Sequence, residues 1–332
     1  MQAPPSFLVI QVSRIGDSLF VTPTLRALAE QFPDAILDIL AHPKRAEIFA
    51  HLPFVRHVRG VTPRTAWMRG WFHKPVYDYS LVYGFDASLI KLGLRLARET
   101  IAFRQADPEL NRRLAHLIEP PPFQSEHAIW QLTHHAEPLG VTTTNPRIAY
   151  GVTLKERLEA ERRLAPLRTH GPLIGIQPRS FPTKPYRDWP LAHFIALCQQ
   201  IRHQIPQARF LVFGGPDDRT HNQPLVANLG DAGQDLSGRL SLRATGAIMS
   251  CLDLYIGVDT GPTHLMSAFD IPMVLFYHCL SGPEMTGPLD HPRCRFLTLR
   301  PRDGHCDASH SLGEIPVAAA WQEIRELLGI NS

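Results

Sequence analysis

The 332-residue chain has no long apolar segment and no marked excess of charge of either sign. Its first apolar run, residues 7–12, is followed at once by Ser13 and Arg14. A secretion signal needs an apolar core of about 7 to 15 residues and a membrane helix needs about 20, so we expect neither. Lys and Arg number 34 against 31 Asp and Glu, for a net charge of +3. Nucleic-acid-binding domains usually have a dense basic stripe, and we do not expect nucleic acid as a partner.

Cysteine is scarce, and the few that occur form no recognisable framework. Their number is odd, and no two stand in the C-x-x-C spacing that is typical of zinc and redox sites. Disulfides are rare in cytosolic proteins, and we predict reduced thiols in a cytosolic protein. The five residues are Cys198, Cys251, Cys279, Cys294 and Cys306.

The composition is that of an ordinary globular protein, with 44% apolar and 20% charged residues. At about 100 to 200 residues per domain, the length predicts two domains. In the first half, short aliphatic runs alternate with amphipathic stretches, which favours an α/β fold with a parallel sheet covered by helices. The predicted strands are 7–12, 36–40, 55–58, 79–83 and 100–103, and the predicted helices include 19–32, 45–51 and 87–96.

A charged helical segment at 153–167, ended by Gly171 and Pro172, is typical of a domain connector. The same alternation of strands and helices then restarts. We therefore predict one domain at 1–165, a second at 171–315 and a terminal helical segment at 316–332. The predicted strands of the second half are 173–177, 209–213, 254–258 and 273–276, and its helices are 191–203, 219–228, 242–250, 262–269 and 316–328.

The loop after the first strand combines Arg14, Gly16 and Asp17. Ligands of open α/β sheets bind beyond the carboxyl ends of the strands, which makes this loop a candidate site. Asp17 suits two roles, a general base or a cap of the following helix. A single glycine does not make the G-x-G-x-x-G pattern of dinucleotide-binding folds, so a nicotinamide dehydrogenase is disfavoured.

A second candidate loop, residues 259–264, has the sequence Asp-Thr-Gly-Pro-Thr-His. Pro262 suits the first position of a helix, where the neighbouring N–H groups are free to bind a phosphate. Asp259 would repel that anion, so we expect it to orient sugar hydroxyls or to fix the loop. A capped helix with nothing bound is the alternative. The amides concerned belong to Thr260, Gly261 and Thr263.

A third loop, residues 178–190, is cationic through Arg179, Lys184 and Arg187. Positive charge near a phosphate site suits a leaving diphosphate, on which negative charge develops during the reaction. The alternative is a solvated loop that Trp189 anchors to the core.

Basic residues of the first half, among them Arg59 and Arg64, lie close in sequence to Trp67. Basic residues interleaved with aromatic ones can bind anionic saccharides or an anionic membrane surface. A merely solvated face is the alternative for each of them.

The order of these motifs resembles glycosyltransferase family nine, the lipopolysaccharide heptosyltransferases. The resemblance runs from Phe7 to about Pro288. The segments concerned are SRIGDSLFVTPTLRALAEQFPDA, RDWP, FLVFGGPDD, DLSGRLSL, YIGVDTGPTHLMSAFDIPMVLF and SGPEMTGP.

This resemblance implies a GT-B fold, in which two Rossmann-like domains face a central cleft and a C-terminal helix returns to the first domain. It implies an inverting transfer of heptose from ADP-heptose to the anionic, lipid-linked core of lipopolysaccharide, with no essential metal or other cofactor. The expected location is cytoplasmic, with peripheral contact at the inner membrane. Another nucleotide sugar or acceptor, and a non-catalytic nucleotide-sugar-binding protein, remain alternatives.

Carried over by motif, Asp17 is the catalytic base. The acceptor-binding residues that we expect are Arg14, Arg59 and Arg64. The residues expected to bind the donor phosphates and sugar are Lys184, Arg187, Asp259, Thr260, Gly261, Thr263 and His264.

The chain departs from the family pattern in three places. Arg187 stands two positions before Trp189, where the family usually has lysine, and an arginine does not reproduce the geometry of a lysine. Residues 81–86 and 278–282 also differ from the usual sequences, which bears on the acceptor contacts and on the identity of the donor.

Overall fold

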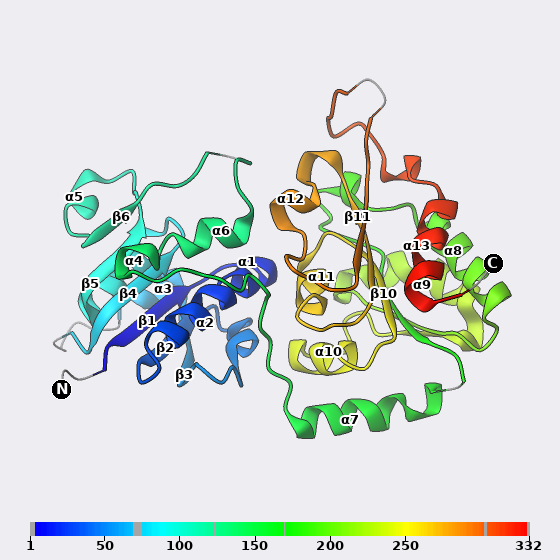
Figure 1. Cartoon of the computed structure of the whole chain (residues 1–332), viewed down its shortest axis with the longest axis horizontal. Coiled ribbons are helices and arrows are strands. Elements are labelled where there is room, and N and C mark those ends of the chain that lie inside the picture. Colours follow the sequence, from blue (N-terminus) through cyan, green and yellow to red (C-terminus); the bar gives the residue numbers. More distant parts are fainter. Residues whose placement is uncertain (1–3, 69–74, 123, 169, 302–303, 331–332) are drawn as a thin grey trace. The chain divides into compact units, whose positions relative to one another are not determined.

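A computed structural model describes residues 4–68, 75–122, 124–168, 170–301 and 304–330. The chain divides into two compact units, Met1–Gly151 and Val152–Ser332 (Figure 1). Each is an α/β unit built on a parallel sheet, as the alternating pattern of the sequence predicts. No helix of the described ranges combines the length and the apolar character that crossing a membrane requires.

In the first unit the described strands form a six-stranded sheet in the order β3-β2-β1-β4-β5-β6, with parallel pairing throughout. The five predicted strands are confirmed, whereas β6 was not foreseen because it has only three residues. The strands are β1 (Ser6–Gln11), β2 (Ile36–Ala41), β3 (His57–Gly60), β4 (Tyr77–Tyr83), β5 (Ala97–Phe103) and β6 (His116–Ile118). The helices are α1 (Ile15–Phe20), α2 (Thr22–Gln31), α3 (Pro63–Ala66), α4 (Ala87–Leu96), α5 (Pro108–Asn111) and α6 (Ala128–Thr133), with the 3-10 turns η1 (Ala46–Phe49) and η2 (Glu137–Leu139).

In the second unit the described strands form a parallel sheet in the order β12-β11-β10-β7-β8-β9. The strands are β7 (Leu173–Gln177), β8 (Arg209–Val212), β9 (Gly233–Asp235), β10 (Leu254–Val258), β11 (Met273–Tyr277) and β12 (Cys294–Thr298). The helices are α7 (Leu154–Leu164), α8 (Leu191–Gln204), α9 (Arg219–Leu229), α10 (Leu242–Met249), α11 (Gly261–Met266), α12 (Pro283–Thr286) and α13 (Val317–Leu328).

Both sheets therefore share the Rossmann order 3-2-1-4-5-6. In this order the connections leave in opposite directions from the first and fourth strands, and the crevice beyond these two strands is the usual ligand site. The switch point lies between β1 and β4 in the first unit and between β7 and β10 in the second.

Unit boundaries differ from our expectation in two respects. The division falls after Gly151, not after residue 165, because α7 packs on α10 and so forms part of the second unit. The terminal helix α13 packs against α8, and its apolar residues Trp321, Ile324 and Leu327 lie in the core of the second unit (Figure 1). The family resemblance implied instead that this helix returns to the first domain.

The prediction of reduced thiols is wrong for one pair of cysteines. Cys279 and Cys306 form a disulfide, with their Cα atoms 6.0 Å apart. They follow the adjacent parallel strands β11 and β12, so the sheet brings both to one edge, which their spacing of 27 residues does not reveal. Cys198 and Cys251 are free and buried, and Cys294 is free and half-buried.

We expect the first unit to lose stability in mild acid because of His135, a fully buried histidine. Its ring centroid lies 4.3 Å from that of Tyr83 and 4.4 Å from that of Phe103. Burial lowers the pKa of His135 from 6.5 to about 3. Between these pH values the unfolded chain takes up a proton that the folded chain excludes. The free energy of unfolding should therefore fall by about 1.4 kcal/mol per pH unit below pH 6.5.

Urea unfolding of wild type and His135→Phe at about pH 7 and about pH 5 tests this expectation. The variant cannot titrate at this position, so its loss of stability between the two pH values should be smaller by about 2 kcal/mol. His203→Gln, at an exposed position of α8, is the control and should behave as wild type. An equal loss in His135→Phe and wild type would contradict the argument.

Candidate active site

Two loops at the switch point of the second unit are joined by a buried ion pair. Arg187, in the 3-10 turn η4 (Pro185–Arg187), follows β7, and Asp259 follows β10. Arg187 Nη1 donates to Asp259 Oδ2 at 2.8 Å, and the two side chains are 16% and 4% exposed. The sequence predicted both residues for one site, and the structure brings them into direct contact.

Asp259 has two further partners. His264 Nε2 lies 3.4 Å from Asp259 Oδ1, and Thr286 Oγ1 donates to the same oxygen at 3.3 Å. Burial alone would raise the pKa of Asp259, but the hydrogen bond and charge of His264 and the charge of Arg187 hold the pKa below its usual value. Asp259 is thus an ionised, buried carboxylate that contacts both Arg187 and His264.

The other residues of the 259–264 loop form the start of α11. Thr260 is the N-cap residue and makes no side-chain capping bond, and Gly261 rather than Pro262 is the first helical residue. The hydroxyl of Thr263 donates to the carbonyl of Val258 at 2.7 Å and lies 2.9 Å from the hydroxyl of Tyr255. Thr263 therefore holds the loop against the end of β10 through its side chain.

Buried polar atoms without a hydrogen-bond partner among the described residues occur at the same edge of the sheet. Such atoms are rare in folded proteins, and several at one sheet edge are typical of a surface that binds a polar ligand. Gln177 and Tyr277 are the last residues of β7 and β11. Because ligands of open α/β sheets bind at the carboxyl ends of the strands, both residues could have been chosen from the sequence. The four atoms are Arg187 Nε, Gln177 Oε1, Tyr277 OH and Ser281 Oγ.

Lys184, the other predicted cation of the loop, is half-buried. Within the described residues its ammonium group makes no ion pair, whereas Arg179 pairs with Asp218 at 3.3 Å. Trp189 is buried and stacks on Phe276 with ring centroids 4.2 Å apart. Trp189 therefore anchors this loop to the core, while the side chains of Arg179, Lys184 and Arg187 are half-buried.

In the first unit, Asp17 lies at the switch point between β1 and β4. It is exposed in the first turn of α1, and the N-cap residue of this helix is Arg14. Gln11 Nε2 donates to the backbone carbonyl of Asp17 at 2.8 Å. Among the described residues nothing hydrogen-bonds or ion-pairs with its carboxylate. Asp17 thus does not act as the cap of α1.

The neighbouring loop after β4 begins with Gly84, whose φ of +101° favours glycine. Asp86 then caps α4 by accepting from the amide of Ser88 at 2.9 Å. Residues 81–86, where the sequence departs from the family pattern, thus form a regular strand end and helix cap.

The predicted acceptor residues separate into two groups. Arg14 is exposed on the same loop as Asp17, whereas Arg59 lies on β3 and Arg64 on α3. The strand β3 is the outer strand, two positions from β1. Arg59 borders a cavity of about 410 Å³ that Asp38 and Tyr77 also line.

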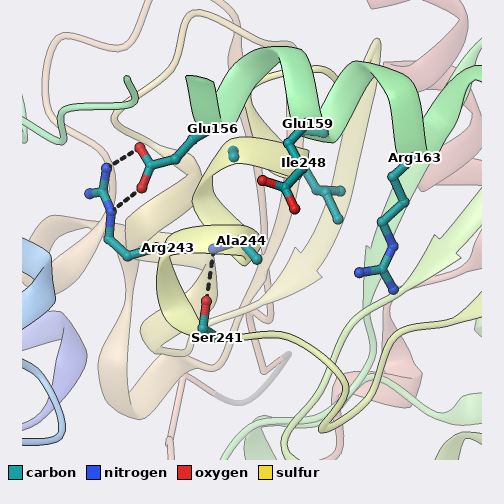
Figure 2. Close-up of a pocket in the computed structure, with 9 residues that line it drawn as sticks. Glu156, Glu159, Arg163, Ser241, Arg243, Ala244 and Ile248 are labelled. Atoms are coloured by element: carbon teal, nitrogen blue, oxygen red, sulfur yellow. Dashed lines mark hydrogen bonds and ion pairs between the residues drawn. The ribbon is translucent and has the colours of Figure 1, made fainter. Parts of the chain in front are cut away.

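A cavity of about 240 Å³ between α7 and α10 includes none of the predicted site residues (Figure 2). Arg243 donates to both carboxylate oxygens of Glu156, at 2.8 and 2.5 Å. This hydrogen bonding, opposed by burial, lowers the pKa of Glu156 to about 2. Glu156 also accepts from the Thr153 amide in a capping box. These bonds explain the observed position of α7, and we assign them a structural role.

Two Rossmann-like units in one chain, each with a parallel sheet, are the architecture of the GT-B fold class. The glycosyltransferase family 9 protein of Veillonella parvula has a TM-score of 0.83, with 18% identity and 98% of each chain covered. Escherichia coli heptosyltransferase WaaC with ADP has a TM-score of 0.71, with 19% identity, and covers 97% of this chain and 99% of that one. The predicted GT-B fold is confirmed.

The chain belongs to glycosyltransferase family 9 (heptosyltransferase), whose family model matches residues 104–306. This region includes the loops 178–190 and 259–264, whereas Asp17 precedes it. Lipopolysaccharide heptosyltransferase 3 of Escherichia coli is 21% identical over 283 residues, which cover 79% of this chain and 80% of that protein. The predicted enzyme class, a glycosyltransferase of the heptosyltransferase type, is therefore confirmed.

Proposed function

We propose that this glycosyltransferase transfers a heptose from ADP-heptose, with inversion, to an anionic lipopolysaccharide core acceptor. The observation that supports it most directly is the buried cluster of Arg187, Asp259 and His264 at the switch point of the second unit. Asp259 and His264 of this cluster belong to the DTGPxH motif that resembles the family's donor loop. One structural relative is described as bound to ADP, and one curated relative is a lipopolysaccharide heptosyltransferase.

On the donor side, Arg187 has one guanidinium nitrogen fixed by Asp259, while its Nε has no partner among the described residues. A positioned cation that is not fully neutralised by its ion-pair partner suits the diphosphate, which gains negative charge as it leaves. Lys184 supplies a second cation on the same loop. The amides of Thr260, Gly261 and Thr263 are the proposed phosphate contacts.

On the acceptor side, Asp17 is the proposed general base. Its carboxylate takes the proton of the acceptor hydroxyl, and the oxygen attacks the anomeric carbon from the face opposite the diphosphate. The bond between that carbon and the diphosphate oxygen breaks, and ADP leaves with the electron pair. Attack on the opposite face inverts the anomeric configuration. Arg14, Arg59 and Arg64 would bind anionic groups of the acceptor, which as a lipid-linked substrate would bring the enzyme to the membrane surface.

A donor screen tests the proposal, because ADP, UDP and GDP differ only in the base. ADP should raise the melting temperature most. At one hundred times its dissociation constant, ADP should add about 2.7 kcal/mol to the free energy of unfolding. ADP-heptose should then be consumed in the presence of a lipopolysaccharide core acceptor. A larger shift with UDP or GDP, followed by turnover of the matching sugar, would replace the proposed donor. Binding of ADP without turnover of any sugar would favour the non-catalytic alternative.

A further inference from the structure

Two His-Cys pairs meet at the carboxyl edge of the second sheet. His278 and Cys279 follow β11, whereas His305 and Cys306 follow the adjacent strand β12. One ring nitrogen of His278 and the sulfur atoms of Cys279 and Cys306 all lie within 4.8 Å of one another. The two sulfurs form a disulfide in the structure. A disulfide needs no histidine; His278 caps the 3-10 turn η7 (Cys279–Ser281) and in addition lies beside both sulfur atoms.

His278 is oriented like a metal ligand. Its side chain is 1% exposed, and its Nε2 lies 3.1 Å from the backbone carbonyl of His310. A carbonyl oxygen can only accept, so Nε2 must have the proton and Nδ1 must have the lone pair. Nδ1 lies 3.8 Å from the sulfur of Cys279. Metal-binding histidines typically donate their other ring N–H to a backbone carbonyl or a carboxylate in this way.

The lone pair of Nδ1 also accepts from the amide of Leu280 at 3.2 Å. That contact agrees with the deduced tautomer. Because Nδ1 has a single lone pair, a metal ion bound there would replace this contact.

We propose that Cys279, Cys306 and His278 bind a divalent transition-metal ion when the disulfide is reduced. Reduction by a dithiol or a phosphine adds two electrons and two protons to the disulfide and gives two thiols. The metal ion then displaces both thiol protons and bonds to two thiolates and one imidazole. This donor set favours Zn²⁺ over Mg²⁺, Ca²⁺ or Mn²⁺, which prefer oxygen ligands.

Three protein ligands leave one position of a tetrahedral site. A water molecule is the expected fourth ligand. The site is distinct from the Arg187–Asp259 cluster but adjacent to its loop, since the ring centroids of His278 and Tyr186 are 4.9 Å apart. The metal would therefore fasten the ends of β11 and β12 beside the loop that bears Arg187.

Cobalt is the probe, because a tetrahedral Co²⁺ site with thiolate ligands has visible d–d bands and a near-ultraviolet charge-transfer band. The full-length protein is reduced with a phosphine, desalted without oxygen and titrated with Co²⁺. We expect one equivalent to bind with both kinds of band, and one equivalent of Zn²⁺ to abolish them. The oxidised protein, with the same sequence and fold, should show no bands.

Variants separate the proposed ligands from the other cysteines. Cys306→Ser and Cys279→Ser should lose the charge-transfer intensity of one thiolate, and His278→Gln should weaken Co²⁺ binding by at least tenfold. Cys294→Ser, a free and half-buried cysteine outside the cluster, is the matched control and should retain the wild-type spectrum. Far-ultraviolet circular dichroism of each variant checks folding.

The comparison of reduced and oxidised wild type remains decisive if a variant does not fold. Absence of the cobalt bands in the reduced wild type would overturn the proposal and leave a disulfide only. Bands that persist unchanged in Cys306→Ser would also overturn it, because the thiolates would then come from elsewhere. Metal analysis of protein purified without oxygen should find about one zinc per chain.

Discussion

Asp17→Asn is expected to lower turnover by about 10²- to 10⁴-fold, the usual contribution of a general base, while the affinity for ADP stays unchanged. The amide keeps the shape of the side chain and removes only its ability to take a proton. The structure makes this substitution selective, because Asp17 is exposed and does not cap α1. Steady-state rates and calorimetric titration with ADP, measured on the same preparation, test both parts of the expectation.

Asp34→Asn is the matched control, since Asp34 is an exposed aspartate of the same unit in the turn before β2. It should leave both quantities at wild-type values. If Asp17→Asn turns over at a rate near wild type, Asp17 is not the base. If the melting temperature of the variant falls sharply, part of the lost activity comes from unfolding. The rates must then be compared at a temperature where both proteins are folded.

The regular elements were predictable where apolar runs are long or clearly periodic. The bounds of β7, β10 and α4 agree with those expected from the sequence. The strands β6, β9 and β12 were missed because their sequences, such as Gly-Gln-Asp in β9, lack the aliphatic run that marks a buried strand. These strands pair at the outer part of each sheet, where burial on both faces is not required.

The candidate site was predictable in its residues but not in its contacts. Arg187 and Asp259 could be chosen as members of one site because both follow strands. Their ion pair, between residues 72 apart in the chain, depends on the adjacency of β7 and β10, which the sequence does not state. The same holds for Cys279 and Cys306, whose strands turned out to be neighbours. In both cases the strand order, and not the residue type, decided which side chains meet.

The ion pair makes Arg187→Ala the substitution with the largest combined effect. Removal of one partner of a buried pair leaves an uncompensated charge and typically costs about 3 to 5 kcal/mol of stability. Asp259 keeps only His264 and Thr286, so we expect a loss in this range on urea unfolding. Turnover should fall as well, because the cation for the departing diphosphate is lost. Arg187→Lys should recover part of both, since the charge returns without the planar fork of the guanidinium.

A double variant separates the two roles of Arg187. In Arg187→Ala with Asp259→Asn, the carboxylate that Arg187 neutralises is removed as well, so stability should rise above that of Arg187→Ala while turnover stays low. Recovery of turnover together with stability would show that Arg187 acts only by neutralising the charge of Asp259.

Lys184→Ala is the comparison within the same loop. Lys184 is half-buried and has no ion-pair partner among the described residues, so its removal should change stability by less than about 1 kcal/mol. Its turnover at saturating donor should exceed that of Arg187→Ala, because only Arg187 is held at the switch point by a buried carboxylate. If Lys184→Ala is instead the inactive variant and folded Arg187→Ala turns over normally, the leaving diphosphate is bound by Lys184. The buried N–H group at Nε of Arg187, which has no hydrogen-bond partner among the described residues, would then need an acceptor other than the diphosphate.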